Sequence, residues 1–216
     1  MKSILCYGDS NTYGFRPVDE LRYDYEQRWT GILAQKLGKD YLVIEEGLNS
    51  RTTAFDDPIA EYKNGLKAIV PTIQAHWPVD LIIVMLGTND LKQRFQTDEK
   101  IIAWGIETVI RRIKELHIQN HPEWQPKILL VSPILLGEGI KDGSLATAEN
   151  FGCQRGYEIA QKLAPLYEKV AKRQRCEFLD AAKIAKPSLI DGIHMQPSEH
   201  QKLAAAFYDK IKTILG

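Results

Sequence analysis

The stretch Ile4-Leu5-Cys6-Tyr7-Gly8-Asp9-Ser10-Asn11-Thr12 decides the fold, because an apolar run stops at a glycine and small polar residues follow it. This pattern predicts a short buried strand that ends in a turn at the carboxyl edge of a sheet, where open α/β folds bind ligands. We interpret Ser10 as a nucleophile displayed at that edge. The alternative is that Asp9, Ser10 or Thr12 only caps the next helix, as such residues often do. On this stretch alone, capping has at least as much support.

Apolar strands and amphipathic helices alternate along the rest of the chain. Further strands are expected at 41–44, 80–86, 127–131 and 176–179, and helices at 29–37, 64–75, 97–117, 154–174 and from 198 onward. This alternation implies right-handed crossovers and a parallel sheet covered on both faces. The segment 133–150 is expected to be a long irregular excursion of the kind that often lies over a site.

Several helix boundaries can also be predicted. Thr97 is expected to cap the long helix, and Ser198 is expected to open the last helix in a capping box with Gln201. Pro71 and Pro165 are expected to bend or break the helices that contain them.

The bulk composition excludes several classes of protein. The chain has 216 residues and no formal net charge, which fits one domain and argues against a nucleic-acid partner or a polybasic membrane patch. Its three cysteines are widely spaced and form no C-x-x-C pair, which suits a reducing compartment. The apolar run before Gly8 is too short for a signal peptide, and no run is long enough to span a membrane. We therefore expect a cytoplasmic protein.

Polar turns follow three of the expected strands. Gly8–Thr12, Gly47–Thr53 and Gly87–Asp90 each begin with glycine and continue with small polar residues. Because the carboxyl ends of parallel strands meet at one edge, this coincidence predicts a site there.

Among the five histidines, His194 stands out because it lies in a loop three residues after Asp191. That spacing can place the carboxylate against Nδ1 and leave Nε2 free to take a proton. A D-x-x-H pair alone is a weak signal. His117 and His121 can form a helical metal pair, but no third ligand is near and exposed helix-end residues are the better account. His200 is expected to be solvated in the first turn of the last helix.

Together, three segments resemble the SGNH (GDSL) hydrolase family. Gly8–Thr12 looks like its first block, Gly87–Asp90 like its third and Asp191–His194 like its last, in the family's order and across nearly the whole chain. The G-x-S-x-G elbow of α/β-hydrolases is absent. Within the family, three segments resemble a bacterial arylesterase and acyltransferase branch: Ile4–Ser10, Glu45–Thr53 and Met85–Asp90.

The resemblance implies a fold and a set of roles. The fold would be a flavodoxin-like three-layer α/β/α sandwich with a five-stranded parallel sheet, formed by a single domain over residues 1–216. Ser10 would attack the acyl carbon, His194 would act as base and then acid, and Asp191 would orient His194. The oxyanion would be bound by the backbone N–H groups of Ser10 and Ser50 and by the side-chain amide of Asn89.

One position departs from the family pattern, because Ser50 stands where the family usually has glycine. A backbone donor needs no particular side chain, so Ser50 can serve. Its Cβ is expected to narrow the space beside the oxyanion, which argues against bulky acyl groups. Tyr13 and Phe15 can line a pocket, although ordinary loop packing is a simpler account of each. The candidates for substrate binding are Asp9, Tyr13, Phe15, Thr88, Lys92 and Ile193.

The expected function is hydrolysis of small aryl or alkyl esters with short acyl chains, with acyl transfer to alcohols as a second activity. No metal or cofactor is expected, and the partner is a small-molecule ester. Alternatives within the family are a carbohydrate acetyl esterase, a lysophospholipase and a thioesterase. A non-catalytic α/β binding protein is a more distant alternative, since neither nucleotide-binding glycine motif follows the first strand. The resemblance also implies a homo-oligomer, with an octamer among the forms it suggests.

Overall fold

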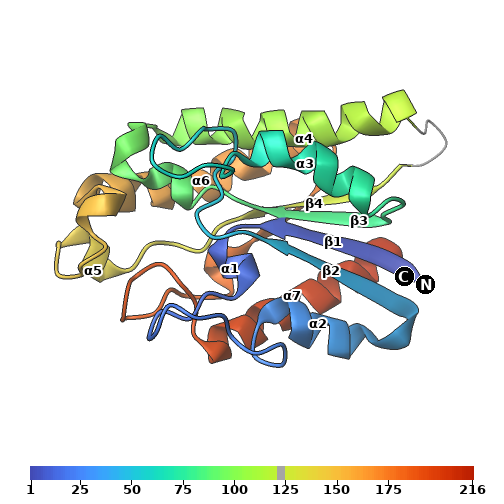
Figure 1. Ribbon diagram of the computed structural model, residues 1–216, viewed down its shortest axis with the longest axis horizontal. Helices are drawn as coiled ribbons and strands as arrows, with labels where there is room; N and C mark the ends of the chain where they lie inside the picture. The colour runs from blue at the N-terminus through green and yellow to red at the C-terminus, as the bar shows by residue number, and fades with distance from the viewer. Residues whose placement is uncertain (121–124) are drawn as a thin grey trace.

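A computed structural model describes residues 1–120 and 125–216 of the chain, in which one parallel sheet separates two layers of helices (Figure 1). The strands are β1 (Lys2–Gly8), β2 (Tyr41–Gly47), β3 (Leu81–Met85), β4 (Lys127–Ser132) and β5 (Glu177–Asp180). They lie in the order β2-β1-β3-β4-β5, and every neighbouring pair is parallel. This confirms the expected three-layer α/β/α fold with a five-stranded parallel sheet.

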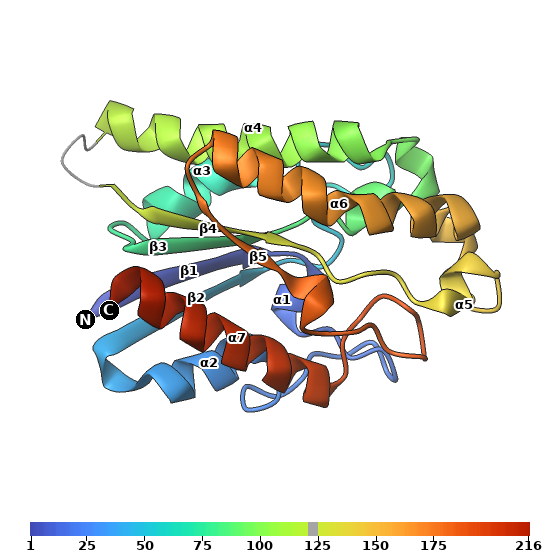
Figure 2. The same cartoon turned by 180° about the vertical axis from the view of Figure 1, so that it is seen from behind.

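The longer helices cover both faces of the sheet. On one face lie α3 (Gly65–Ala75), α4 (Glu99–Asn120) and α6 (Cys153–Arg173), and on the other lie α2 (Trp29–Leu37) and α7 (Pro197–Leu215) (Figure 2). The shorter helical segments are α1 (Ser10–Tyr13), α5 (Glu138–Lys141), η1 (Gly38–Asp40), η2 (Asn89–Leu91), η3 (Gln93–Phe95), η4 (Glu149–Phe151) and η5 (Ala181–Lys183).

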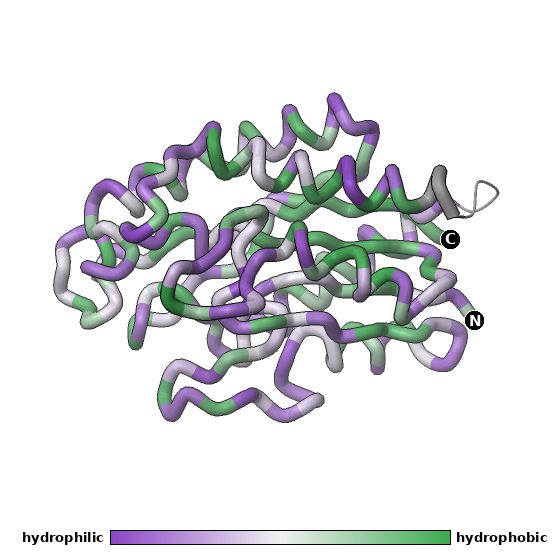
Figure 3. Tube along the Cα trace, turned by 45° about the horizontal axis from the view of Figure 1, so that its top comes forward, coloured by the Kyte–Doolittle hydropathy of each residue, from purple (hydrophilic) through white to green (hydrophobic). Residues whose placement is uncertain are grey.

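Alternate residues of each strand supply the two apolar cores. In β1, Leu5 and Tyr7 join the core under α3, α4 and α6, whereas Ile4 and Cys6 join the core under α2 and α7. Side chains of a strand point to opposite faces in turn, so a strand that is apolar throughout can fill both cores. Polar and apolar residues alternate along the outer helix at the top of Figure 3, as expected of helices with one face on a core.

The order of the strands determines where a ligand can bind. From β1 the chain first moves to the edge strand β2 and then returns to β3 on the other side of β1. Crevices form outside the carboxyl ends of the strands where the direction of winding reverses in this way. Here that point lies between β1 and β3, and the turns after both strands carry candidate site residues.

Two of the predicted helix caps are wrong. The cap of α4 is Asp98, whose Oδ1 accepts from the backbone N–H groups of Lys100 and Ile101 at 2.9 and 2.8 Å, while the Thr97 hydroxyl donates to the carbonyl of Asp90. The last helix begins at Pro197 and has no side-chain cap, so Ser198 lies inside it. Proline is favoured in the first turn because it lacks the N–H that a cap would satisfy.

Other expectations need smaller changes. Helices α3 and α6 continue across Pro71 and Pro165 without a break. The segment 133–150, expected to be irregular, contains α5 and the start of η4. Of the proposed pair, His121 lies outside the described residues, and so does the side chain of His117. In the described part of the chain, no helix has both the length and the apolar composition needed to cross a membrane.

Candidate active site

Ser10 is the first residue of α1, directly beyond the carboxyl end of β1. The preceding residue, Asp9, caps this short helix by accepting from the backbone N–H of Asn11 at 3.0 Å. A Cβ on Gly8 would lie 2.0 Å from the Thr12 hydroxyl, so only glycine fits where the strand turns into the helix. Capping and display are therefore both realised: Asp9 caps the helix, and the Ser10 hydroxyl is left for another partner.

That partner is His194, which comes from the loop between β5 and α7. Its Nε2 lies 2.8 Å from the Ser10 Oγ, and its Nδ1 is hydrogen-bonded to Oδ2 of Asp191. With the Nδ1 proton directed at the carboxylate, Nε2 can accept from the serine hydroxyl. The structure thus brings together three side chains whose residues are up to 184 positions apart in the chain.

Asp191 is held by more than the imidazole. Its Oδ1 accepts from the backbone N–H groups of Ile193 and His194 at 3.0 and 3.1 Å and from the Ser188 hydroxyl at 2.9 Å. Burial alone would raise the pKa of this carboxyl, but the hydrogen bonds, that from His194 foremost, outweigh it and lower the pKa below its ordinary value. Asp191 is therefore an anion at neutral pH, which suits a group that orients and stabilises an imidazolium.

The second polar turn has an unusual backbone conformation at position 50. Ser50 has φ +65°, in the left-handed region that glycine adopts without strain. Its hydroxyl accepts from Lys92 Nζ at 3.1 Å, and this hydrogen bond restricts rotation of the Ser50 side chain. Nearby, Asn89 donates from Nδ2 to the carbonyl of Arg51 at 3.1 Å, so the second and third polar turns are joined directly.

Buried charges lie behind these turns. Asp90 accepts from the backbone N–H of Thr53 at 3.0 Å, and burial raises its pKa to about 6. Burial also raises the pKa of Asp9 and lowers that of Lys92 to about 8. Lys92 is only 6% exposed, and no carboxylate among the described residues lies within ion-pair distance of it.

The candidates for substrate binding are placed unequally. The ring of Phe15 lies against His194, with centroids 4.3 Å apart, and Lys92 touches Ser50. Tyr13 instead packs under Arg22, whose guanidinium carbon is 4.5 Å from the ring centre. Ile193 is buried, and Asp9 is engaged in capping. A narrow hollow beside Ser10 is lined by Asp9, Asn11, Met85, Thr88, Pro133 and Ile134.

The prediction for His200 is wrong, because its side chain is fully buried instead of solvated. Its Nδ1 accepts from the backbone N–H of Trp29 at 3.3 Å, and burial lowers its pKa to about 4. The polar residues around His200 suggest an exposed first helical turn, but the fold places that turn under the loop before α2.

A larger hollow of about 660 Å³ beside α3 contains none of the three residues Ser10, Asp191 and His194.

Comparison with known families agrees with this geometry. The model of the GDSL-like Lipase/Acylhydrolase family matches residues 6–202, a range that includes Ser10, Asp191 and His194. The chain belongs to this family. It is accordingly a carboxylic ester hydrolase of the SGNH type.

Several solved structures are similar to the chain over its whole length. The chain is similar to Est24, a carbohydrate acetylesterase from Sinorhizobium meliloti, with 37% identity, 100% of each chain covered and a TM-score of 0.92. It is also similar to the aryl esterase of M. smegmatis, with 34% identity, 100% of each chain covered and a TM-score of 0.92. A lipase/acylhydrolase from Enterococcus faecalis, at 18% identity and a TM-score of 0.70, covers 100% of this chain and 98% of its own and shares the fold. A comparison with curated proteins gave no match.

Proposed function

We propose that Ser10, His194 and Asp191 act as nucleophile, base and orienting carboxylate in the hydrolysis of small carboxylic esters through an acyl-enzyme. The observation that carries this proposal is the 2.8 Å approach of the Ser10 Oγ to Nε2 of an imidazole whose Nδ1 is bonded to a carboxylate. A serine hydroxyl is a weak nucleophile unless a base accepts its proton, and this arrangement supplies the base.

The reaction has two balanced halves. Ser10 Oγ attacks the acyl carbon while its proton passes to His194 Nε2, and the tetrahedral intermediate then collapses, expelling the alcohol, which takes that proton. Water then attacks the acyl-serine with the same base, releasing the carboxylic acid and restoring the hydroxyl. Asp191 stabilises the imidazolium in both halves without itself taking a proton.

We assign the oxyanion to three donors: the backbone N–H groups of Ser10 and Ser50 and the Asn89 amide. Asn89 already donates one hydrogen to Arg51, and its second hydrogen remains for the ligand. The assignment of the Ser50 N–H is supported by the left-handed backbone at this residue. Such a strained conformation persists only where the neighbouring structure holds it, and it is common at functional sites. Loss of one such donor typically costs about 10²–10³-fold in kcat.

The test uses p-nitrophenyl acetate and the Ser10→Ala variant. Turnover should disappear, while Ser132→Ala, which alters a buried serine bonded to Asp180 at 3.0 Å, should retain it. A fluorophosphonate should label Ser10 alone, as located by mass spectrometry. Unchanged turnover by Ser10→Ala would exclude the proposal.

The substrate class belongs to the same proposal. The solved structures named above include an aryl esterase and a carbohydrate acetylesterase. The Cβ that Ser50 carries is expected to narrow the space beside the oxyanion, so we favour acetyl and other short acyl groups. Rates with p-nitrophenyl acetate, p-nitrophenyl octanoate and an acetylated sugar would rank the aryl and carbohydrate alternatives. Acyl transfer to an added alcohol is a second proposed activity, and formation of acid alone would count against it.

Location and assembly complete the proposal. We place the enzyme in the cytoplasm, and the support is that its three cysteines are free thiols, as a reducing compartment keeps them. We also propose a homo-oligomer, on resemblance to the arylesterase branch, and light scattering would show a single subunit mass if this were wrong.

A further inference from the structure

Asn11 follows the nucleophile in the chain, and its side chain reaches the residues on both sides of His194. Its Nδ2 donates to the carbonyl of Ile193 at 3.2 Å, and its Oδ1 accepts from the backbone N–H of Met195 at 3.2 Å. The residue is only 4% exposed, so these bonds are shielded from water. A single amide therefore holds the chain immediately before and immediately after the imidazole.

The two bonds reproduce one rung of a parallel β-ladder. In such a ladder, a residue donates to the carbonyl that precedes its partner and accepts from the N–H that follows it. The Asn11 side chain makes the same pair of bonds with His194 at the centre. Rotation of the His194 backbone would break buried hydrogen bonds that have no replacement, which is costly.

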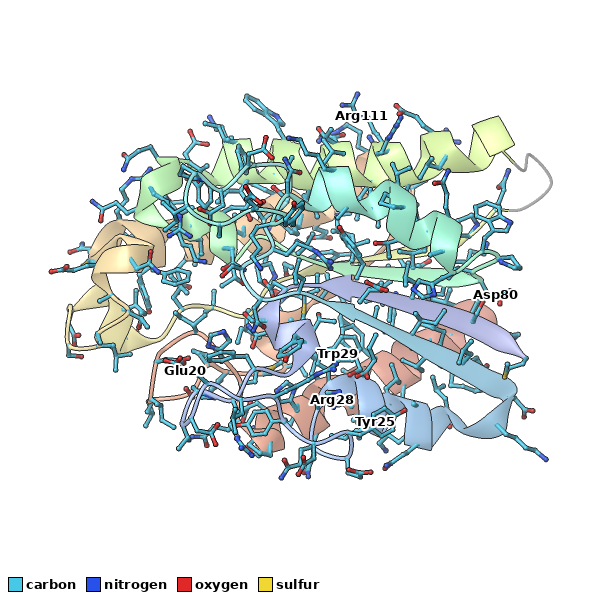
Figure 4. All side chains as sticks on the ribbon, viewed as in Figure 1. Glu20, Tyr25, Arg28, Trp29, Asp80 and Arg111 are labelled. Carbon is cyan, nitrogen blue, oxygen red and sulfur yellow. The ribbon has the colours of Figure 1, made fainter. Side chains whose placement is uncertain are left out.

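Asn11 is itself anchored through its backbone. Its N–H donates to Asp9 at 3.0 Å, and its carbonyl accepts from the indole Nε1 of Trp29 at 3.1 Å. Trp29, at the start of α2 (Figure 4), is fully buried, and its backbone N–H donates to Nδ1 of His200. The buried histidine and tryptophan thus fix α1, and α1 carries both the nucleophile and the amide that holds the base.

We infer that Asn11 is a positioning residue that sets the distance between the Ser10 hydroxyl and His194 Nε2. The inference rests on the proposed function, since it presupposes that these two groups exchange a proton. It adds a residue whose side chain bonds to the chain on both sides of His194 and therefore acts through the loop that it holds. A misplacement of about 1 Å in a reacting pair can cost about 100-fold in rate.

The experiment compares Asn11→Leu, which is close in size and cannot hydrogen-bond, with Asn11→Asp, which keeps the acceptor for Met195 and loses the donor to Ile193. We expect kcat/KM for p-nitrophenyl acetate to fall about 10- to 100-fold in Asn11→Leu and by an intermediate factor in Asn11→Asp. Labelling of Ser10 by a fluorophosphonate should slow in parallel. The downfield proton resonance of the His194 Nδ1–H should broaden, because the imidazole is no longer held in one orientation.

The matched control is Asn64→Leu. Asn64 is 6% exposed and also bridges two backbone segments, donating to Ala54 and accepting from Lys67, both at 3.2 Å. This variant should lose stability while keeping the resonance and the kcat/KM per folded molecule.

Each outcome decides the inference. An Asn11→Leu protein with wild-type kcat/KM and an unchanged resonance would overturn it, and so would an Asn64→Leu protein that lost activity to the same degree at equal folded fraction. If Asn11→Leu fails to fold, Asn11→Asp decides on the same two measurements. Activity in Ser10→Ala would refute the proposed function, whereas full activity in Asn11→Leu with an inactive Ser10→Ala would refute only this inference.

Discussion

Lys92 should make the folded protein less stable at neutral pH than a neutral side chain of similar length would. Burial, and after it the nearby charge of Arg94, lower the pKa of its ammonium from 10.5 to about 8, and the carboxylates around it offset only part of this change. The perturbation we choose is Lys92→Met, which keeps an unbranched side chain of nearly the same length and removes the charge.

The magnitude follows from the size of this pKa change. Each pKa unit corresponds to about 1.4 kcal/mol, so retaining the charged form in the folded state costs about 3 kcal/mol. The variant also loses the 3.1 Å hydrogen bond to Ser50. Such a bond contributes about 1 kcal/mol, which leaves a net gain of about 2 kcal/mol at pH 7.

The pH dependence has a definite sign. Between pH 8 and 10.5 the unfolded chain still binds the proton that the folded protein has released, so wild-type stability rises through this window. Below pH 8 the destabilisation is fully present, and above pH 10.5 it is gone. The advantage of Lys92→Met should therefore shrink as pH increases from 8 to 10.5.

Urea denaturation at pH 7 and pH 10 would measure the effect. The control is Lys100→Met, at an exposed lysine, which should shift stability little and equally at both pH values. A Lys92→Met protein less stable than wild type at pH 7, or a difference that did not change with pH, would refute the argument.

Three further perturbations test other parts of the structure. Asp191→Asn should leave the protein folded but lower kcat/KM by about 10⁴-fold, because the amide favours the wrong histidine tautomer; near-normal ester turnover would contradict this. The wild type should lose about 3 kcal/mol of unfolding free energy as pH falls from 6.5 toward 4, because the unfolded chain takes up a proton that folded His200, with a pKa of about 4, resists. His200→Gln should remove this loss. The same dependence of the unfolding free energy on pH in both proteins, measured by urea denaturation, would contradict this. Gly47→Ala should destabilise the fold by about 3 kcal/mol, because its Cβ would lie 2.1 Å from the backbone N of Tyr13; a normal urea midpoint would show that the turn adjusts.

Much of the fold could be predicted because the signals were local. The apolar stretch at β3 and the glycine after α2 each specify their element within a few residues. The long helix was also predicted, yet its cap was assigned to Thr97 instead of Asp98, since both residue types cap and only the fold shows that the Thr97 hydroxyl is bonded to Asp90. Boundaries depend on such competition, which the sequence does not record.

The site residues also differ in whether a local sequence pattern marks them. Ser10, Asp191 and His194 each lie in a short segment with a recognisable residue pattern, and the structure brings the three together. His200 and Asn11 carry no such pattern, because their roles arise from contacts with Trp29 and with the chain around His194. A polar residue beside a helix start looks the same whether it faces water or a buried backbone group.

Under the roles proposed for Ser10 and His194, their contact also determines when activity can first appear during translation. The ribosome makes the Ser10 hydroxyl 184 residues before the His194 imidazole. A nascent chain that stops short of the β5–α7 loop can possess most of the sheet and still be inert towards esters. Under the proposed function, the appearance of ester hydrolysis therefore reports that synthesis has passed the β5–α7 loop and that this loop has packed against α1, and a chromogenic ester can time that step.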